Sequence, residues 1–135
     1  MGLETAKIFS SQGWNVVATM RNPIVIGTSV PNILCLPLDV TRSETIEPAI
    51  TAAIEKFGAI DVLINNAGYA LIGAFEACTS EEIERQFATN VFGLMAVTRP
   101  ILPHFRGRRQ GIIVNVASIG GKITFLLYSS YQGCY

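Results

Sequence analysis

The sequence predicts an α/β protein in which helices cover both faces of a parallel β-sheet. Two observations support this fold class. Four short apolar segments alternate with segments whose apolar residues recur at helical spacing, and each apolar segment is followed by a polar residue. Strands joined through helices run parallel because right-handed crossovers return the chain to the same edge of the sheet. We therefore expect the carboxyl ends of the strands to meet at one edge.

The first part of the chain predicts one helix and two strands. Apolar residues on one side of Leu3–Gln12 predict a helix, which Gly13 ends. Trp14–Thr19 is a β-prone run that turn residues close, and Ile33–Leu38 is a second run of this kind. Such short apolar runs are typical of buried parallel strands.

A second helix and a third strand follow. Thr41 and Glu44 have the spacing of a capping box, and apolar residues then recur at helical spacing until Gly58. Pro48 conflicts with that start, so the alternative is a first turn that begins a few residues later. Ile60–Ile64 is the third apolar run.

A long helix precedes the fourth strand. Thr79 and Glu82 have the spacing of a second capping box. The apolar stripe that follows includes one polar residue and consists of Ile83, Phe87, Asn90, Leu94, Ile101 and Phe105. We expect a kink around Pro100 and Pro103. The fourth strand is Ile112–Val116.

Composition and charge argue against several classes of function. Ten basic residues balance ten acidic ones, and no long basic run suggests nucleic acid or an anionic membrane as a partner. No segment reaches the ~20 apolar residues of a membrane-spanning helix. The three cysteines are widely spaced, so we expect reduced thiols, no metal site and a cytoplasmic location. A small-molecule ligand is the remaining expectation.

Polar side chains follow each predicted strand, where ligands bind in open α/β sheets. These residues are Arg21, Asp39, Asn65 with Asn66, and Ser118. Ordinary loop composition would also place polar residues there, so the identities of these residues must carry the functional argument.

The chain resembles the short-chain dehydrogenase/reductase family over nearly all of its length. The resemblance rests on Asn65-Asn66-Ala67-Gly68, on Asn90-Val91-Phe92-Gly93, and on Ser118 at thirteen residues before Tyr131. It implies a Rossmann-like three-layer fold, in which residues 1–135 form a partial NAD(P)-binding domain. It also implies an oxidoreductase that moves a hydride between nicotinamide and an alcohol or ketone substrate. Members of the family tend to form homo-oligomers.

The same resemblance assigns roles to individual residues. Asn90, Ser118 and Tyr131 are the implied catalytic residues, with Ser118 polarising the carbonyl and Tyr131 exchanging a proton with it. The residues implied on the cofactor side are Gly2, Arg21, Asp39, Val40, Asn65, Asn66, Ala67 and Gly68. Gly2 resembles the last glycine of a phosphate-binding loop, because a helix follows it.

Three of these positions have an alternative interpretation. Asn90 could satisfy backbone groups at a helix kink, whereas the resemblance makes it a water-holding link in a proton relay. Asp39 could simply begin a turn, whereas the resemblance places it against the adenine ring. Arg21 could be a solvated surface charge. However, an arginine at this place in the family fold can bind a 2′-phosphate, which predicts NADP rather than NAD.

Two departures from the family pattern affect the expected activity. Tyr135 stands where the family carries a lysine, one helical turn after Tyr131. A cation about 4 Å from a phenolate is worth ~4 kcal/mol at an effective dielectric near ~20, so the Tyr131 phenolate lacks that stabilisation. The family's first strand and its later elements have no counterpart, so we expect a sheet split at its centre and a chain that is inactive alone.

Three functional hypotheses follow. The first is a fragment of an NADP-dependent oxidoreductase that acts on an alcohol or a carbonyl. The second is a non-catalytic module of the same fold that binds a dinucleotide or a partner chain. The third is a structural interaction protein, which needs an oligomer that covers the split sheet.

Overall fold

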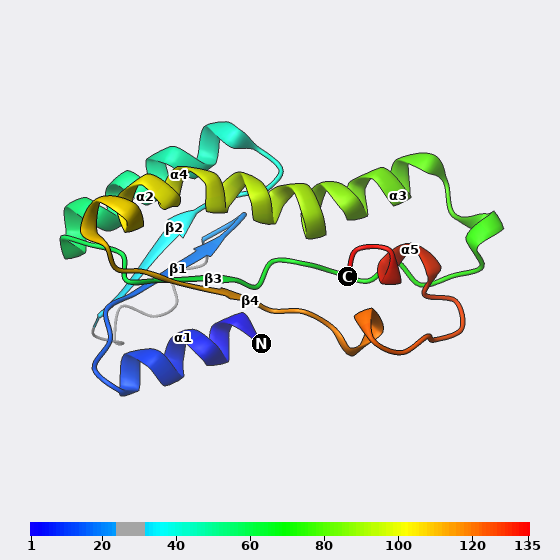
Figure 1. Ribbon diagram of the computed structural model, residues 1–135, viewed down its shortest axis with the longest axis horizontal. Helices are drawn as coiled ribbons and strands as arrows, with labels where there is room; N and C mark the ends of the chain where they lie inside the picture. Colours follow the sequence, from blue (N-terminus) through cyan, green and yellow to red (C-terminus); the bar gives the residue numbers. More distant parts are fainter. Residues whose placement is uncertain (24–31) are drawn as a thin grey trace.

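Strands and helices alternate along the chain in the computed structural model, which describes residues 1–23 and 32–135 (Figure 1). Their order is α1 (Gly2–Ser11), β1 (Val16–Met20), β2 (Ile33–Pro37), α2 (Ser43–Phe57), β3 (Val62–Asn65), η1 (Phe75–Ala77), α3 (Ser80–Phe87), η2 (Ala88–Gly93), α4 (Leu94–Arg108), β4 (Ile112–Asn115), η3 (Ile119–Gly121) and α5 (Ser129–Gln132). All four predicted strands are present, and their ends lie within two residues of the prediction.

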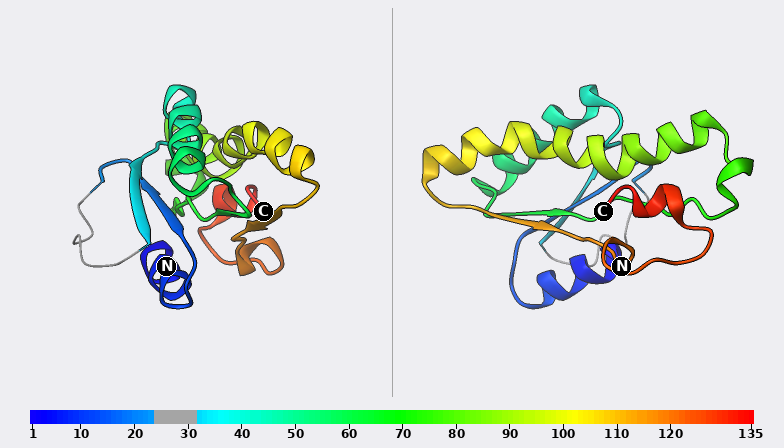
Figure 2. Two further views of the ribbon diagram at one scale, coloured as in Figure 1. Left: turned by 90° about the vertical axis from the view of Figure 1, so that its left-hand side faces the viewer. Right: turned by 45° about the vertical axis from the view of Figure 1, so that its right-hand side comes forward.

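The strands pair in parallel and form two separate two-stranded sheets within the described residues. β1 pairs with β2, starting with Val16 opposite Ile33, and β3 pairs with β4, starting with Val62 opposite Ile112. Figures 1 and 2 show α1 on one side of the strands and α2 and α4 on the other side. The predicted α/β class is confirmed, and the sheet is divided as expected.

The start of α2 differs from the prediction. The helix begins at Ser43 and has no side-chain hydrogen bond at its N-cap. Thr41, the predicted cap, instead donates to Oδ1 of Asp39 from its N–H at 3.0 Å and from its hydroxyl at 2.7 Å. The predicted capping box of Thr41 and Glu44 is therefore wrong, because the N-cap position is Arg42, one residue later than this box requires. Pro48 lies inside the helix and does not delay its start.

One long helical segment runs from α3 through the π-helical turn η2 into α4 (Figure 1). Its predicted capping box is confirmed, because the Thr79 hydroxyl accepts from the Glu82 N–H at 3.2 Å and the Glu82 carboxylate accepts from the Thr79 N–H at 3.0 Å. The irregular turn η2 lies before Pro100 and Pro103, where the sequence predicts a kink. The helix α4 runs through both prolines without a break. This wider turn carries Asn90 on its buried side.

The core lies between α2, α4 and the strands β2 and β3. Its buried members are Leu38, Ile46, Ala49 and Val97, with Leu36, Val40, Ile50, Leu63 and Ala96 packed against them. Because Leu36 belongs to β2 and Leu63 to β3, this one cluster contacts both sheets. The strands are less buried than their apolar sequences predict, and all four residues of β4 are exposed. A divided sheet buries less of each strand.

The three cysteines carry free thiols. Within residues 1–23 and 32–135, no helix combines the length and apolar character needed to cross a membrane. The same residues contain no group of three or more His, Cys, Asp or Glu side chains that could hold a metal ion.

Candidate functional site

Asn65 ends β3, where the sequence predicts a cofactor contact. Its Nδ2 donates to Oδ1 of Asn115 at 2.9 Å and to Oγ1 of Thr98 at 3.1 Å. These two bonds join the ends of β3 and β4 to α4. Asn65 therefore holds the strand ends that border the site.

The start of α1 lies against the residue that follows β3. A Cβ atom on Gly2 would be 3.0 Å from Nδ2 of Asn66, so a side chain there would have to displace Asn66. Asn66, Ala67 and Gly68 are exposed in this loop. The first backbone N–H groups of a helix carry a partial positive charge that favours anions. The structure thus brings together two predicted cofactor-binding residues, Gly2 and Asn66, at a helix start.

A polar pocket of about 500 Å³ lies at the carboxyl ends of β1 and β2. Its lining consists of Arg21, Asn22, Pro37, Leu38, Asp39, Arg42 and Thr45. Two predicted cofactor residues, Arg21 and Asp39, therefore share one pocket. Sequence reasoning missed the second cation, Arg42, although its place in the turn after β2 was a usable signal.

The Asp39 carboxylate is held by its own turn. Hydrogen bonds from the Thr41 hydroxyl and N–H lower the pKa of Asp39, and the positive charges of Arg21 and Arg42 act in the same direction. Asp39 thus begins a turn, as its alternative interpretation states, and its contact with adenine stays a prediction. The next residue, Val40, packs against the core, and its predicted cofactor contact also stays a prediction.

Asn90 holds the loop after β3 through both polar atoms of its amide. Its Oδ1 accepts from the Tyr69 N–H at 3.1 Å, and its Nδ2 donates to the Tyr69 carbonyl at 2.9 Å. Gly68 packs on this amide, because a Cβ on Gly68 would lie 3.3 Å from Oδ1 of Asn90. Asn90 therefore satisfies backbone groups beside a helix irregularity, and its place in a proton relay stays a prediction.

Ser118 and Tyr131 meet across Gly120. A Cβ on Gly120 would lie 3.4 Å from Oγ of Ser118 and 3.4 Å from Cε1 of Tyr131, so the hydroxyl and the ring border one space. The Ser118 Oγ accepts from the Gly120 N–H at 3.1 Å, an arrangement in which its own proton can be donated to a ligand. The structure thus places both predicted catalytic side chains beside Gly120.

Tyr135 completes this cluster. Its ring packs edge-on against Tyr131 with the ring centroids 5.1 Å apart, and a Cβ on Gly68 would lie 3.7 Å from its hydroxyl. Burial, followed by the hydrogen bond and charge of the Tyr131 phenol, raises the pKa of Tyr135 to about 12. Burial also raises the pKa of Cys134, whose thiol interacts with Asn90. Among the described residues, the hydrogen bonds of arginine and lysine side chains go to groups other than the phenols of Tyr131 and Tyr135.

Sequence reasoning also missed Gln86, which is completely buried on α3. Its amide contacts the Tyr69 carbonyl and the Ser130 hydroxyl. The available signal was its position four residues before Asn90, because this spacing places two amides on one helix face.

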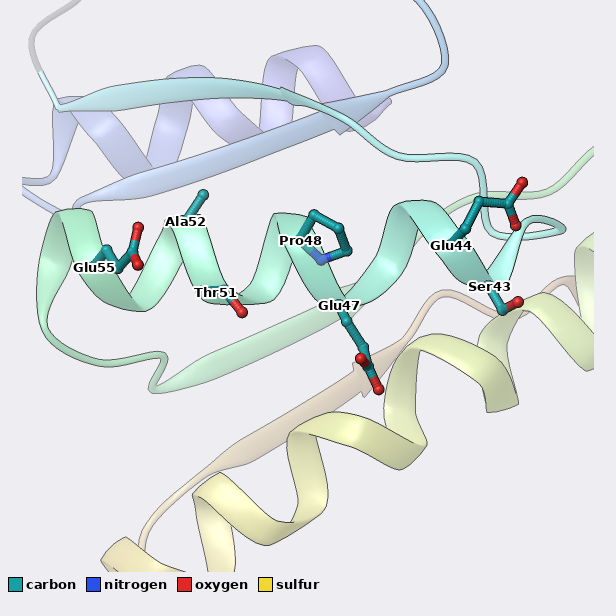
Figure 3. A pocket seen from close by; sticks show the side chains of 7 residues that line it. All are labelled: Ser43, Glu44, Glu47, Pro48, Thr51, Ala52 and Glu55. Atoms are coloured by element: carbon teal, nitrogen blue, oxygen red, sulfur yellow. The ribbon is translucent and has the colours of Figure 1, made fainter.

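A second hollow, of about 550 Å³, lies on the exposed face of α2 (Figure 3). It is lined by Ser43, Glu44, Glu47, Pro48, Thr51, Ala52 and Glu55. Three of these side chains are carboxylates and none is basic, so this hollow does not suit an anionic dinucleotide. The pocket that contains Arg21 and Arg42 does.

The chain is similar to known proteins in sequence and in structure. A family model described as short chain dehydrogenase matches residues 1–134. An uncharacterized oxidoreductase of Schizosaccharomyces pombe is 47% identical over 116 residues, which cover 84% of this chain and 49% of that protein. A 3-ketodihydrosphingosine reductase of Bacteroides thetaiotaomicron is 39% identical over 134 residues, which cover 99% of this chain and 47% of that protein.

The crystal structure of a 3-ketoacyl-(acyl-carrier-protein) reductase from Brucella melitensis, complexed with NADH, is similar with a TM-score of 0.92. Its sequence is 30% identical, and the match covers 98% of this chain and 59% of that chain. The chain spans about half the length of the curated relatives it matches, at 49% and 47%.

Proposed function

Because the chain belongs to the short-chain dehydrogenase family, we propose that its site binds NADP(H) and interconverts a small ketone and the matching alcohol. The family makes the chain an NAD(P)-dependent oxidoreductase by resemblance. The observation that carries the proposal is the space at Gly120 that the Ser118 hydroxyl and the Tyr131 ring border. A ketone is favoured because two similar proteins are named as keto reductases.

The pocket at the ends of β1 and β2 fits the adenosine end of NADP. Arg21 and Arg42 both line it, and a guanidinium group binds phosphate through paired N–H donors. A site for a free 2′-hydroxyl instead presents a carboxylate. The carboxylate in this pocket, Asp39, already accepts two hydrogen bonds from Thr41. These contacts support NADP over NAD.

Ser118 and Tyr131 supply the hydrogen bond and the proton that a carbonyl substrate needs. When bound, NADPH supplies a hydride to the carbonyl carbon and leaves as NADP⁺. The Ser118 hydroxyl donates to the carbonyl oxygen, and the Tyr131 phenol transfers its proton to that oxygen, so that an alcohol forms. In the opposite direction Tyr131 takes this proton back. Asn90 holds the loop at Tyr69, and Gly68 of this loop lies near the Tyr135 hydroxyl.

Cofactor preference is tested by titrating the full chain with NADPH and NADH. We expect tighter binding of NADPH, and we expect Arg21→Ala to weaken it by about tenfold or more, because hydrogen bonds to charged groups contribute ~1.5–3 kcal/mol. Arg42→Ala should have a smaller effect, since Glu44 already pairs with Arg42 at 2.8 Å. Arg106→Ala, exposed on α4, is the matched control. Equal loss of NADPH and NADH binding in Arg21→Ala would contradict the NADP preference.

Turnover is tested by following NADPH oxidation with a panel of ketones. We expect Tyr131→Phe to reduce turnover by roughly 10²–10⁴-fold while NADPH still binds, because a positioned proton donor contributes about that factor. Tyr128→Phe is the matched control, since its ring lies 5.9 Å from that of Tyr131 in the same segment. Unchanged turnover in Tyr131→Phe would remove the proposed proton donor.

Tyr135 favours a second candidate function, in which the chain binds a dinucleotide without turnover. Its phenol supplies no positive charge to stabilise a phenolate at Tyr131. NADPH binding without turnover, together with turnover after Tyr135→Lys, would support this candidate. Turnover in the unmodified chain would exclude it.

A further inference from the structure

Gln86 has no exposed surface, although its side chain is a polar amide. An amide buried without partners strongly destabilises a fold, so its contacts are informative. Its Oε1 accepts from the Ser130 hydroxyl at 3.3 Å, and its Nε2 donates to the Tyr69 carbonyl at 3.5 Å. One side chain on α3 therefore links the loop after β3 to α5, which are far apart in the sequence.

The contact with Tyr69 couples Gln86 to Asn90. The Tyr69 carbonyl accepts from Nε2 of Gln86 and, at 2.9 Å, from Nδ2 of Asn90. Asn90 also accepts from the Tyr69 N–H at 3.1 Å. The two amides lie one helical turn apart and hold the same peptide group, so a change in one alters the position of the other.

The contact with Ser130 couples Gln86 to Tyr131. Ser130 is buried and directly precedes Tyr131, and α5 contains four residues, too few for a helix that is stable alone. Contacts with α3 and η3 therefore hold α5 in place. Successive helical residues point about 100° apart, so a Ser130 side chain turned toward Gln86 leaves Tyr131 facing Gly120.

We propose that Gln86 is a positioning residue that holds Tyr131 and Asn90 in a fixed relation through one buried amide. This inference rests on the proposed function, in which Tyr131 is the proton donor. Gln86 acts on Tyr131 through Ser130 and on Asn90 through the Tyr69 carbonyl, and it does not touch the reacting atoms.

The test compares four variants of the full chain. Gln86→Met keeps a similar side-chain volume but can form neither hydrogen bond. Ser130→Ala removes the hydrogen bond between Ser130 and Gln86 and leaves the contact of Gln86 with Tyr69 intact. The double variant Gln86→Met/Ser130→Ala completes a double-mutant cycle with the two single variants. Gln110→Met, at an exposed position, is the matched control. The tyrosines are labelled with ¹³C at the ζ carbon, and NMR records one signal for each of them. The signal that disappears in Tyr131→Phe belongs to Tyr131.

We expect Gln86→Met and Ser130→Ala each to shift the Tyr131 signal, and we expect the double variant to show less than the sum of the two shifts. We also expect Gln86→Met to lower kcat about 3- to 10-fold with little change in the KM for NADPH, as the loss of the hydrogen bond that holds Ser130, and through it Tyr131, predicts. If Gln86→Met does not fold, Ser130→Ala alone must still shift the signal.

A Tyr131 signal that is the same in Gln86→Met, Ser130→Ala and Gln110→Met would overturn the inference. This outcome is separate from a failure of the proposed function. Absence of turnover in the unmodified chain would overturn the proposed function, whereas the Tyr131 signal tests Gln86 without any turnover.

Discussion

Tyr135 shapes the chemistry around Tyr131. Its ring lies edge-on to Tyr131, and a Cβ on Gly121 would lie 2.8 Å from the Cβ of Tyr135, so the side chain is packed on two sides although 43% of the residue stays exposed. A phenolate in this place would lose hydration and face the oxygen of a second phenol. Both effects favour the neutral form and explain why the pKa of Tyr135 is raised to about 12.

A tyrosinate titration tests this residue. The chain has four tyrosines. We expect Tyr135 to ionise later than the unfolded-chain value of ~10, because burial raises its pKa to about 12. Tyr135→Phe should remove this late phase, whereas Tyr128→Phe should keep it. Near-ultraviolet absorbance measures the titration. A late phase that survives in Tyr135→Phe would show that another tyrosine is the confined one.

The same pKa has a consequence for stability. The folded protein holds the Tyr135 proton more tightly than the unfolded chain, where tyrosine has a pKa of ~10. Its contribution to the free energy of unfolding is therefore fully present below about pH 10 and is lost as pH rises toward about 12. Urea denaturation within this window should show a smaller pH dependence for Tyr135→Phe than for the unmodified chain.

The single residues differ in how far the sequence predicts them. The need of Asn90 for partners follows from its place on an apolar stripe, and the structure supplies those partners at Tyr69. Gln86 has the same polar character, but its partners Tyr69 and Ser130 are distant in the sequence. The spacing to Asn90 indicates the helix face of Gln86, but the local pattern does not identify its partners. Arg42 becomes a pocket residue only when β1 and β2 pair.

The turn η2 shows how contacts between elements set local form. Gly93 ends this turn and is buried, and a Cβ there would lie 2.6 Å from Cγ2 of Val40. The helix can pass this close to Val40 because position 93 has no side chain. Since Val40 also packs against the core, this contact joins the end of β2 to the long helix that carries Asn90.

Substitution at Gly93 tests this contact. We expect Gly93→Ala to lower the free energy of unfolding by ~1–3 kcal/mol, because the new methyl group overpacks the contact with Val40. Gly107→Ala is the matched control on α4, where no atom lies within 4 Å of an added Cβ, and it should stabilise the helix by ~0.5–1 kcal/mol. Urea denaturation measures both. Equal effects of the two substitutions would contradict the proposed close packing.

Elements whose signals are local are the ones that the sequence predicts well. The start of α3 follows from Thr79 and Glu82, which are three residues apart. The start of α2 is predicted wrongly by one residue, because the N-cap position is Arg42 and not Thr41. The form of η2 is not predicted, and the close approach of Gly93 in this turn to Val40 joins segments that are far apart in the sequence. Local spacing therefore locates a helix start to within one residue, whereas contacts between distant segments lie outside what it indicates.

At the scale of the whole molecule, two separate sheets depend on one core. β1 and β2 form one sheet, and β3 and β4 form the other. The cluster around Ile46 and Val97 joins α2 to α4 and contacts strands of both sheets. Figure 2 shows these helices together on one side of all four strands. The two halves should therefore unfold together, since this buried cluster belongs to both of them.

Val97→Ala tests this cooperation, because Val97 is buried on α4 while Trp14, the single tryptophan, lies beside α1 against Phe9. Removing two methyl groups from the core should lower the free energy of unfolding by ~1–3 kcal/mol. We expect tryptophan fluorescence and far-ultraviolet circular dichroism to shift together in urea, although the substitution lies in the other half. Val114→Ala, exposed on β4, is the control and should change both signals less. A fluorescence transition that stays in place while the dichroism transition moves would mean that the two sheets unfold independently.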